Sequence, residues 1–167
     1  WRGLSSRAPI SRGRKLPELI KREAFLTKVR HGEELSGSIL ANADLSGQNL
    51  FGVNLQGVVF RAVRMNGVNL AGARLTNVIW AEVDLTDADL RGAEFTGASI
   101  DLSKLVRCRL GEAKLTRLFW TTSDLTGSDF SKAVLDTASF AECIFAKANF
   151  EGAGLLKSVI ADSNLES

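Results

Sequence analysis

The chain has 167 residues, of which 45% are apolar and 24% charged, with two cysteines and one histidine. This composition suits one soluble globular unit, and no run of residues approaches the roughly 18 consecutive apolar positions of a transmembrane helix. The single histidine, His31, excludes zinc sites and catalytic triads that need two histidines, and no phosphate-binding loop or C-x-x-C motif is present. We therefore expect a noncatalytic protein with no catalytic residue, metal or cofactor.

Charge is distributed unevenly along the chain. Residues 1–32 carry nine basic and two acidic side chains, a net charge of +7, whereas residues 33–167 carry twelve basic and seventeen acidic ones, a net charge of −5. Residues 1–15 contain no acid and have the composition both of a basic arm and of the remnant of an organellar transit segment. An acidic subunit or an anionic membrane surface would suit this arm, and nucleic acid is disfavoured because few aromatic residues interleave. Its basic residues are Arg2, Arg7, Arg12, Arg14 and Lys15.

The next segment, residues 16–32, is predicted to form a short capping helix. Pro17 suits a first helical turn and Glu18 its positive end. Lys28 and Arg30 suit the last turn, and Gly32 follows as the terminating residue.

A five-residue period governs the rest of the chain. Every fifth residue from Leu35 to Leu165 is large and apolar, at all 27 positions, a pattern that chance would give roughly once in a billion sequences. The residue two places earlier is usually small. Ten of the fifteen glycines in the chain stand two places after a large apolar residue of this period. Neither a helix nor a strand has a period of five, so the chain must turn at every repeat. The glycines mark these bends.

The motif A(D/N)LxG, as in residues 43–47, resembles the pentapeptide-repeat family over residues 33–167. The resemblance implies an all-β fold, a right-handed quadrilateral β-solenoid with four pentapeptides in each coil. It implies about seven coils and a rod about 32 Å long at the usual strand spacing of about 4.8 Å. Residues 16–32 are then expected to cover the open first coil, which would hide an exposed sheet edge.

Several inward positions carry unusual side chains. Cys108 and Cys143 occupy small inward positions almost two coils apart, so we expect buried thiols without a disulfide. Trp80 and Trp120 share one inward column whose interior is narrow for an indole ring. Either the coil widens locally to hold these side chains, or the side chains rotate outward.

Two surfaces are candidates for binding a partner. On one of the four faces the outward residue before each large apolar position is repeatedly apolar, and we call this set the apolar stripe. Residues 1–30 could cover its first members, but a protein partner is favoured for the rest. The last coil offers an uncovered edge to a second copy or to another protein, unless the native chain continues beyond residue 167. The stripe consists of Ile39, Val59, Ile79, Phe119 and Val159, and the edge of Leu155, Ile160 and Leu165.

These features predict a noncatalytic interaction module or scaffold, an accessory subunit of a larger complex, with a homodimer as one option. The alternative is a DNA-mimic protein acting on a type II topoisomerase. It is disfavoured because acidic and basic residues alternate along the columns, as in Asp44, Arg64 and Asp84, instead of forming an anionic surface. The family's occurrence in the chloroplast lumen and the transit-like leader favour the chloroplast thylakoid over the mitochondrion, as a soluble or peripheral protein.

Overall fold

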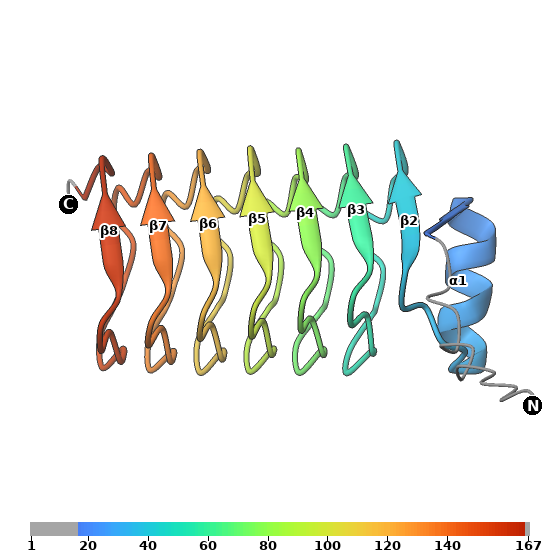
Figure 1. Ribbon diagram of the computed structural model, residues 1–167, viewed down its shortest axis with the longest axis horizontal. Helices are drawn as coiled ribbons and strands as arrows, with labels where there is room; N and C mark the ends of the chain where they lie inside the picture. The colour runs from blue at the N-terminus through green and yellow to red at the C-terminus, as the bar shows by residue number, and fades with distance from the viewer. Residues whose placement is uncertain (1–16, 166–167) are drawn as a thin grey trace, which may run out of the picture.

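The structure, a computed structural model, describes residues 17–165. The chain winds into a β-solenoid of about seven coils, with one helix lying across its first coil (Figure 1). Eight short parallel strands follow one another in a single sheet in chain order. They are β1 (Glu18–Ile20), β2 (Ser38–Ala41), β3 (Val59–Arg61), β4 (Ile79–Ala81), β5 (Ser99–Asp101), β6 (Phe119–Thr121), β7 (Ser139–Ala141) and β8 (Val159–Ala161), and the helix is α1 (Arg22–His31).

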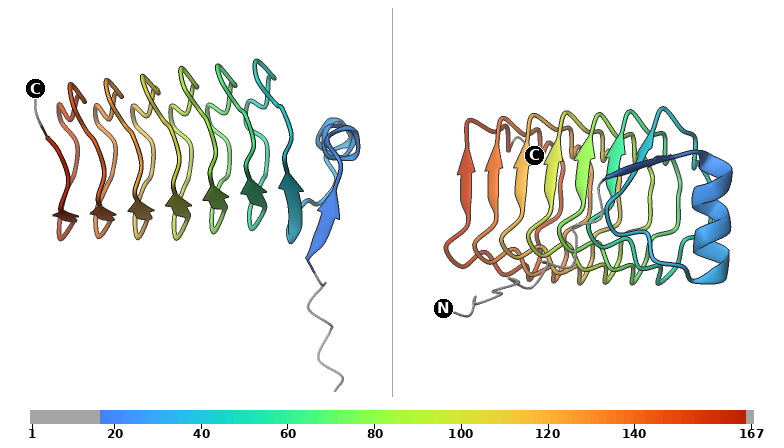
Figure 2. Two further views of the ribbon diagram at one scale, coloured as in Figure 1. Left: turned by 90° about the horizontal axis from the view of Figure 1, so that it is seen from above. Right: turned by 45° about the vertical axis from the view of Figure 1, so that its right-hand side comes forward.

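Each coil has four faces of five residues, because the residues that pair across neighbouring coils lie twenty positions apart. Face 1 carries the eight strands, and the other faces are joined by single parallel bridges. The bridges of face 2 begin with Asp44 and Arg64, those of face 3 with Asn49 and Asn69, and those of face 4 with Asn54 and Arg74. The views in Figure 2 show the coils stacked in register along the rod.

The large apolar residues of the five-residue period form the core, as predicted. All 23 from Leu35 to Phe145 are at most 3% exposed. Consecutive residues of an extended segment point to opposite sides, so an inward residue at each centre leaves its two neighbours facing solvent. Trp80 and Trp120 both point inward and are fully buried, which excludes outward rotation. Aromatic neighbours surround them, with Phe95 5.2 Å from Trp80 and Phe140 5.8 Å from Trp120 between ring centroids.

The corners explain the glycines. Each of the 26 corner residues, at intervals of five from Gly37 to Asp162, has a positive φ, and ten of them are glycine. This left-handed backbone costs a residue with a Cβ atom about 1–2 kcal/mol. Sixteen corners nevertheless carry other residues, including the β-branched Thr122 at φ 46°. Hydrogen bonds between coils, such as Thr122 N to Ala141 O at 3.0 Å, hold these corners in place.

The N-terminal cap differs from the prediction. Helix α1 begins at Arg22 instead of near residue 16, and residues 18–20 form strand β1, which pairs with β2. Pro17 therefore precedes a strand, where a residue with fixed φ and no N–H is tolerated at the sheet margin. The predicted end of the helix is confirmed, since Gly32 has a φ of +64°.

The helix covers the first coil, as expected. Phe25 is fully buried beneath it and its ring lies 5.8 Å from that of Phe60. Arg22 Nε donates a hydrogen bond of 2.6 Å to the carbonyl oxygen of Asp44. Ile20 of β1 and Phe25 of α1 are the buried apolar residues of the cap, so the cap closes the first coil with apolar side chains.

Candidate protein-interaction surface

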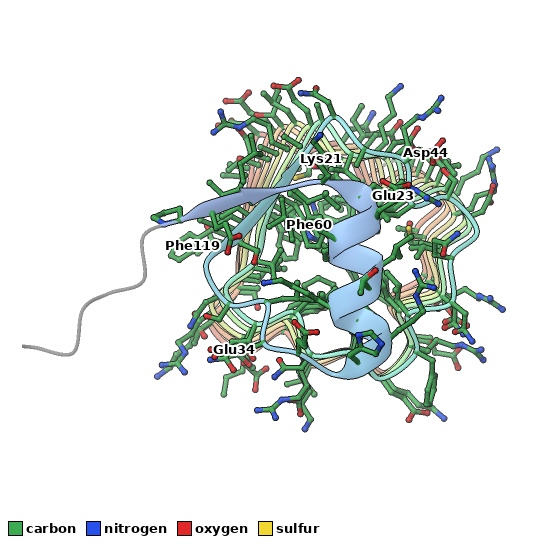
Figure 3. The ribbon with its side chains drawn as sticks, turned by 90° about the vertical axis from the view of Figure 1, so that its right-hand side faces the viewer. Lys21, Glu23, Glu34, Asp44, Phe60 and Phe119 are labelled. Carbon is green, nitrogen blue, oxygen red and sulfur yellow. The ribbon has the colours of Figure 1, made fainter. Side chains whose placement is uncertain are left out.

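The apolar stripe lies along face 1. The strand register places Ile39 beside Val59 and Val59 beside Ile79, with Ser99 and Ser139 as the only polar interruptions between residues 39 and 159. Phe119 is 62% exposed, and Figure 3 shows its ring projecting from the side of the rod. Ile79 and Val159 are also exposed, whereas Ile39 and Val59 are half-buried.

Strand β1 adds a residue to the stripe that sequence reasoning missed. Leu19 pairs with Ile39, faces outward and is 71% exposed. The sequence prediction had placed this position within the capping helix of residues 16–32. The signal was present in the sequence, because Glu18-Leu19-Ile20 stands twenty residues before Ser38-Ile39-Leu40.

A second outward column runs beside the stripe on face 1, and most of its side chains are small. It makes the face flat, since an alanine side chain rises little above the backbone. Its two charged members between β2 and β8 are Arg61 in β3 and Asp101 in β5. The column consists of Ala41, Arg61, Ala81, Asp101, Thr121, Ala141 and Ala161.

The end of the rod at β8 is the second candidate surface. Leu155, Ile160 and Leu165 hold the same positions in the repeat as the fully buried residues of earlier coils, yet all three are exposed. The aromatic cluster beneath them is packed, with the rings of Phe130 and Phe150 stacked at 4.8 Å.

The other faces carry charge in pairs. On face 2 the Arg64 and Asp44 side chains approach to 2.6 Å, and on face 4 those of Lys114 and Glu94 to 2.8 Å. Within residues 17–165, no such ion pair joins Asp84 and Lys104, the next two charged residues along the same column of face 2.

Face 3 holds a cluster that the sequence did not predict. Arg91 binds the Asp89 carboxylate through two hydrogen bonds of 2.9 and 2.7 Å, and Arg109 lies 3.1 Å away. The hydrogen bond from Arg91 lowers the pKa of Asp89 below its ordinary value, against the opposing effect of burial. Both arginine side chains pair with the Asp89 carboxylate, so this cluster stabilises the coil surface.

The cysteines are structural, as predicted. Both are buried and free, and the Cys108 thiol donates to the carbonyl oxygen of Leu85 at 2.9 Å. Burial raises the pKa of Cys108 to about 12 and also raises that of Cys143. A thiol that does not ionise is a poor nucleophile and a poor metal ligand. Over residues 17–165, no group of three or more His, Cys, Asp or Glu side chains is placed to hold a metal ion.

The basic residues of the leader lie outside the described residues. Within residues 17–165, no helix has the length and apolar content that crossing a membrane requires.

Comparison with known proteins agrees with this architecture. No curated protein sequence matches the chain significantly. Among solved structures, a trypsin-treated form of QnrB1, a plasmid-mediated fluoroquinolone resistance protein, is 21% identical, with 89% of this chain and 70% of that chain covered and a TM-score of 0.73. This likeness shows a shared fold.

Two further structures superpose less closely. Rfr23, a pentapeptide repeat protein from the cyanobacterium Cyanothece 51142, is 17% identical over 83% of this chain and 98% of its own, with a TM-score of 0.48. A pentapeptide repeat protein from the Arabidopsis thaliana thylakoid lumen is 25% identical over 60% and 67%, with a TM-score of 0.24. The family described as Pentapeptide repeats matches residues 34–67, 64–105 and 103–140, with eight copies. The chain belongs to the pentapeptide-repeat family.

Proposed function

We propose that this protein is a noncatalytic scaffold that binds protein partners through face 1, as an accessory subunit of a larger complex. The observation that supports it is the apolar stripe on a flat, otherwise small-residue surface. Solvated monomers seldom leave an apolar band of this length exposed. The core beneath it, including Trp80 and Trp120, is fully packed, so the face is a rigid surface that needs no rearrangement to bind.

The size of the stripe sets the strength of binding. Its four most exposed members are Leu19, Ile79, Phe119 and Val159. Together they offer roughly 350 Å² of apolar area, which is worth about 9 kcal/mol when buried. Association itself costs about 4–15 kcal/mol. The stripe alone therefore gives weak binding. The second outward column of face 1 must also be buried for the affinity to reach the micromolar range.

Substitution of exposed apolar residues on two different faces tests the proposal. Phe119→Asp and Ile79→Asp should abolish co-purification of the partner from the native source. Ile144→Asp is the matched control, because Ile144 is exposed to a similar degree but lies on face 2. Circular dichroism checks that each variant folds. Association that survives both face 1 substitutions would refute the assignment.

The end of the rod supports a second docking surface in the same proposal. Ile160→Asp introduces a charge among the exposed residues of the last coil and leaves every residue of the stripe unchanged. We expect it to remove only end-on partners, measured by the same co-purification. If Ile160→Asp changes no association, the last coil is not an interface.

Mimicry of DNA toward a type II topoisomerase is the second candidate function. The observation that favours it is the shared fold with QnrB1. Against it stand the ion pairs on faces 2 and 4, which neutralise carboxylates that a DNA mimic would present. A gyrase supercoiling assay decides, because inhibition or protection at stoichiometric dose would place this function first.

The leader supports an organellar location, with the chloroplast thylakoid as the first choice. Five basic and no acidic side chains in residues 1–15 also favour an acidic subunit or an anionic membrane surface as its contact. Fractionation of the native source tests the location. Sedimentation with vesicles containing anionic lipid, compared with neutral vesicles, tests the contact.

A further inference from the structure

Face 1 carries two opposite charges in a symmetric arrangement. Arg61 in β3 and Asp101 in β5 stand in the same outward column, one coil to either side of β4. Neither has an ion-pair partner within residues 17–165. Thr121 Oγ1 donates a hydrogen bond of 2.6 Å to Asp101 Oδ1, which orients the carboxylate. Because both charges lie on an otherwise uncharged stretch of sheet, their positions restrict what can cover the face.

A second copy of the chain can cover face 1 by either of two twofold axes in the plane of the interface. An axis along the rod would place Arg61 opposite Val59 and Asp101 opposite Ser99, with all four charges unpaired. An axis along strand β4 makes the rods antiparallel and places Arg61 opposite Asp101 of the second copy, twice. Facing sheets pack about 10 Å apart, a gap that an extended arginine and an aspartate together can span. Unpaired charges in an interface cost several kcal/mol, so charge favours the axis along β4.

The same axis brings part of the apolar stripe together, while Leu19 faces Ser139 and Val159 of β8 lies beyond the overlap. Ile79 lies on the axis and meets Ile79 of the second copy, while Ile39 meets Phe119 in both halves. Val59 faces Ser99.

One residue opposes this arrangement. Glu82 stands at the corner beside β4 and would approach its own copy. It lies at the solvent-exposed rim, where like charges are screened, so its cost is small beside two ion pairs within the face.

The area is sufficient for a specific dimer. With the axis along β4, seven strands of each copy overlap. At about 4.8 Å between strands and a face about five residues wide, they give a plane of about 29 Å by 16 Å, or roughly 460 Å² for each copy. Side-chain relief raises the accessible area toward the roughly 800 Å² per partner of standard interfaces.

We propose that the partner on face 1 is a second copy of this chain, bound face to face with antiparallel rods about a twofold axis along β4. The inference rests on the proposed function, because it names the occupant of the same face. It assigns Arg61 and Asp101 as the residues that set the register.

A charge-swap experiment on the full chain tests the dimer. Sedimentation equilibrium should show a dimer with a dissociation constant of about micromolar order. Arg61→Asp and Asp101→Arg should each weaken it at least tenfold, because each places like charges opposite one another. The double variant Arg61→Asp/Asp101→Arg should restore it to near the original strength. Lys147→Asp is the control, since it changes charge equally at an exposed corner between faces 2 and 3.

Several results would overturn the inference. One is a chain that stays monomeric at a protein concentration 100-fold above the expected dissociation constant. The others are single charge reversals that leave dimerisation unchanged, or a double variant that dimerises as weakly as the single variants. A dimer lost only on Ile160→Asp would assign dimerisation to the last coil. A monomer that dimerises when residues 1–15 are removed would assign the face to the leader. If no dimer forms but Phe119→Asp still removes a different partner, the proposed function stands and only the identity of the occupant fails.

Discussion

Removal of the Phe25 ring should detach the N-terminal cap from the rod. Phe25 is the fully buried residue of α1, and its ring meets Phe60 edge to face at 5.8 Å and 77°. A buried Phe→Ala change costs about 3–5 kcal/mol. A ten-residue helix has little stability of its own. The remaining ties of the cap are the half-buried Leu26 and Val29, the bond from Arg22 and the pairing of β1, with its buried Ile20, to β2. The cost of Phe25→Ala therefore falls on the cap.

Hydrogen exchange on the native protein measures this loss. We expect amides of α1 and β1 in Phe25→Ala to exchange about 150 to 5,000 times faster than in the parent chain, the factor that corresponds to this free energy. Amides of β4 to β8 should be unaffected, because each coil of a repeat protein contacts only its neighbours. Leu26→Ala, at a half-buried position of the same helix, is the control and should accelerate exchange about tenfold or less.

Two results would contradict this reasoning. Unchanged protection of α1 would show that Phe25 does not anchor the helix. Equal loss of protection along the whole rod would show that the coils open as one unit instead of from the end.

Three shorter predictions concern the coils. Cys108, whose pKa burial raises to about 12, should resist iodoacetamide at pH 8 and react once urea unfolds the chain; rapid labelling of the folded protein would contradict its burial. The hydrogen bond from Arg91 lowers the pKa of Asp89 in the folded state. The contribution of Asp89 to the free energy of unfolding is therefore complete above its pKa in the unfolded chain, about 4, and is lost as pH falls through its pKa in the folded chain. Asp89→Asn should thus lower the urea midpoint at pH 7, with the difference closing toward pH 2, and a constant difference would contradict this. Thr122→Gly should stabilise by up to about 1 kcal/mol by relieving a left-handed backbone, whereas Thr121→Gly should destabilise by about 1–2 kcal/mol; urea midpoints that shift in the same direction would refute the corner argument.

The coil was predictable because its determinants are local. A large residue such as Leu45, a small residue two places before it and a bend at Gly47 are repeated so often that the inward side is fixed by the spacing alone. The burial of residues 35–145 followed directly. The position of the stripe on one face followed as well, because it needs only the assumption of four repeats in each coil.

The cap was predicted only in part. Pro17 and Glu18 have the composition of a helix start, and local propensity cannot show that a strand twenty residues later offers them a pairing edge. Pairing with β2 competes with the helix and wins because it satisfies the backbone of β1 and buries Ile20. Leu19 joined the stripe through the same pairing.

The ion pairs were the least predictable feature. Arg107 reaches Asp87 across one coil, yet both occupy corners and not the column in which charge was expected to alternate. Long flexible side chains choose among several acids within reach, and the choice depends on corner geometry that a one-dimensional pattern does not contain.

The twenty-residue register couples changes in chain length to the surface. Insertion or deletion of five residues would preserve every inward position and the hydrogen-bonded ladder, yet it would turn all later residues onto the next face. An insertion between β4 and β5 would move Phe119 and Val159 a quarter turn away from Ile79 without harming the core. Only changes of twenty residues lengthen or shorten the rod and keep the face continuous, so the interface can be altered by steps that leave folding untouched.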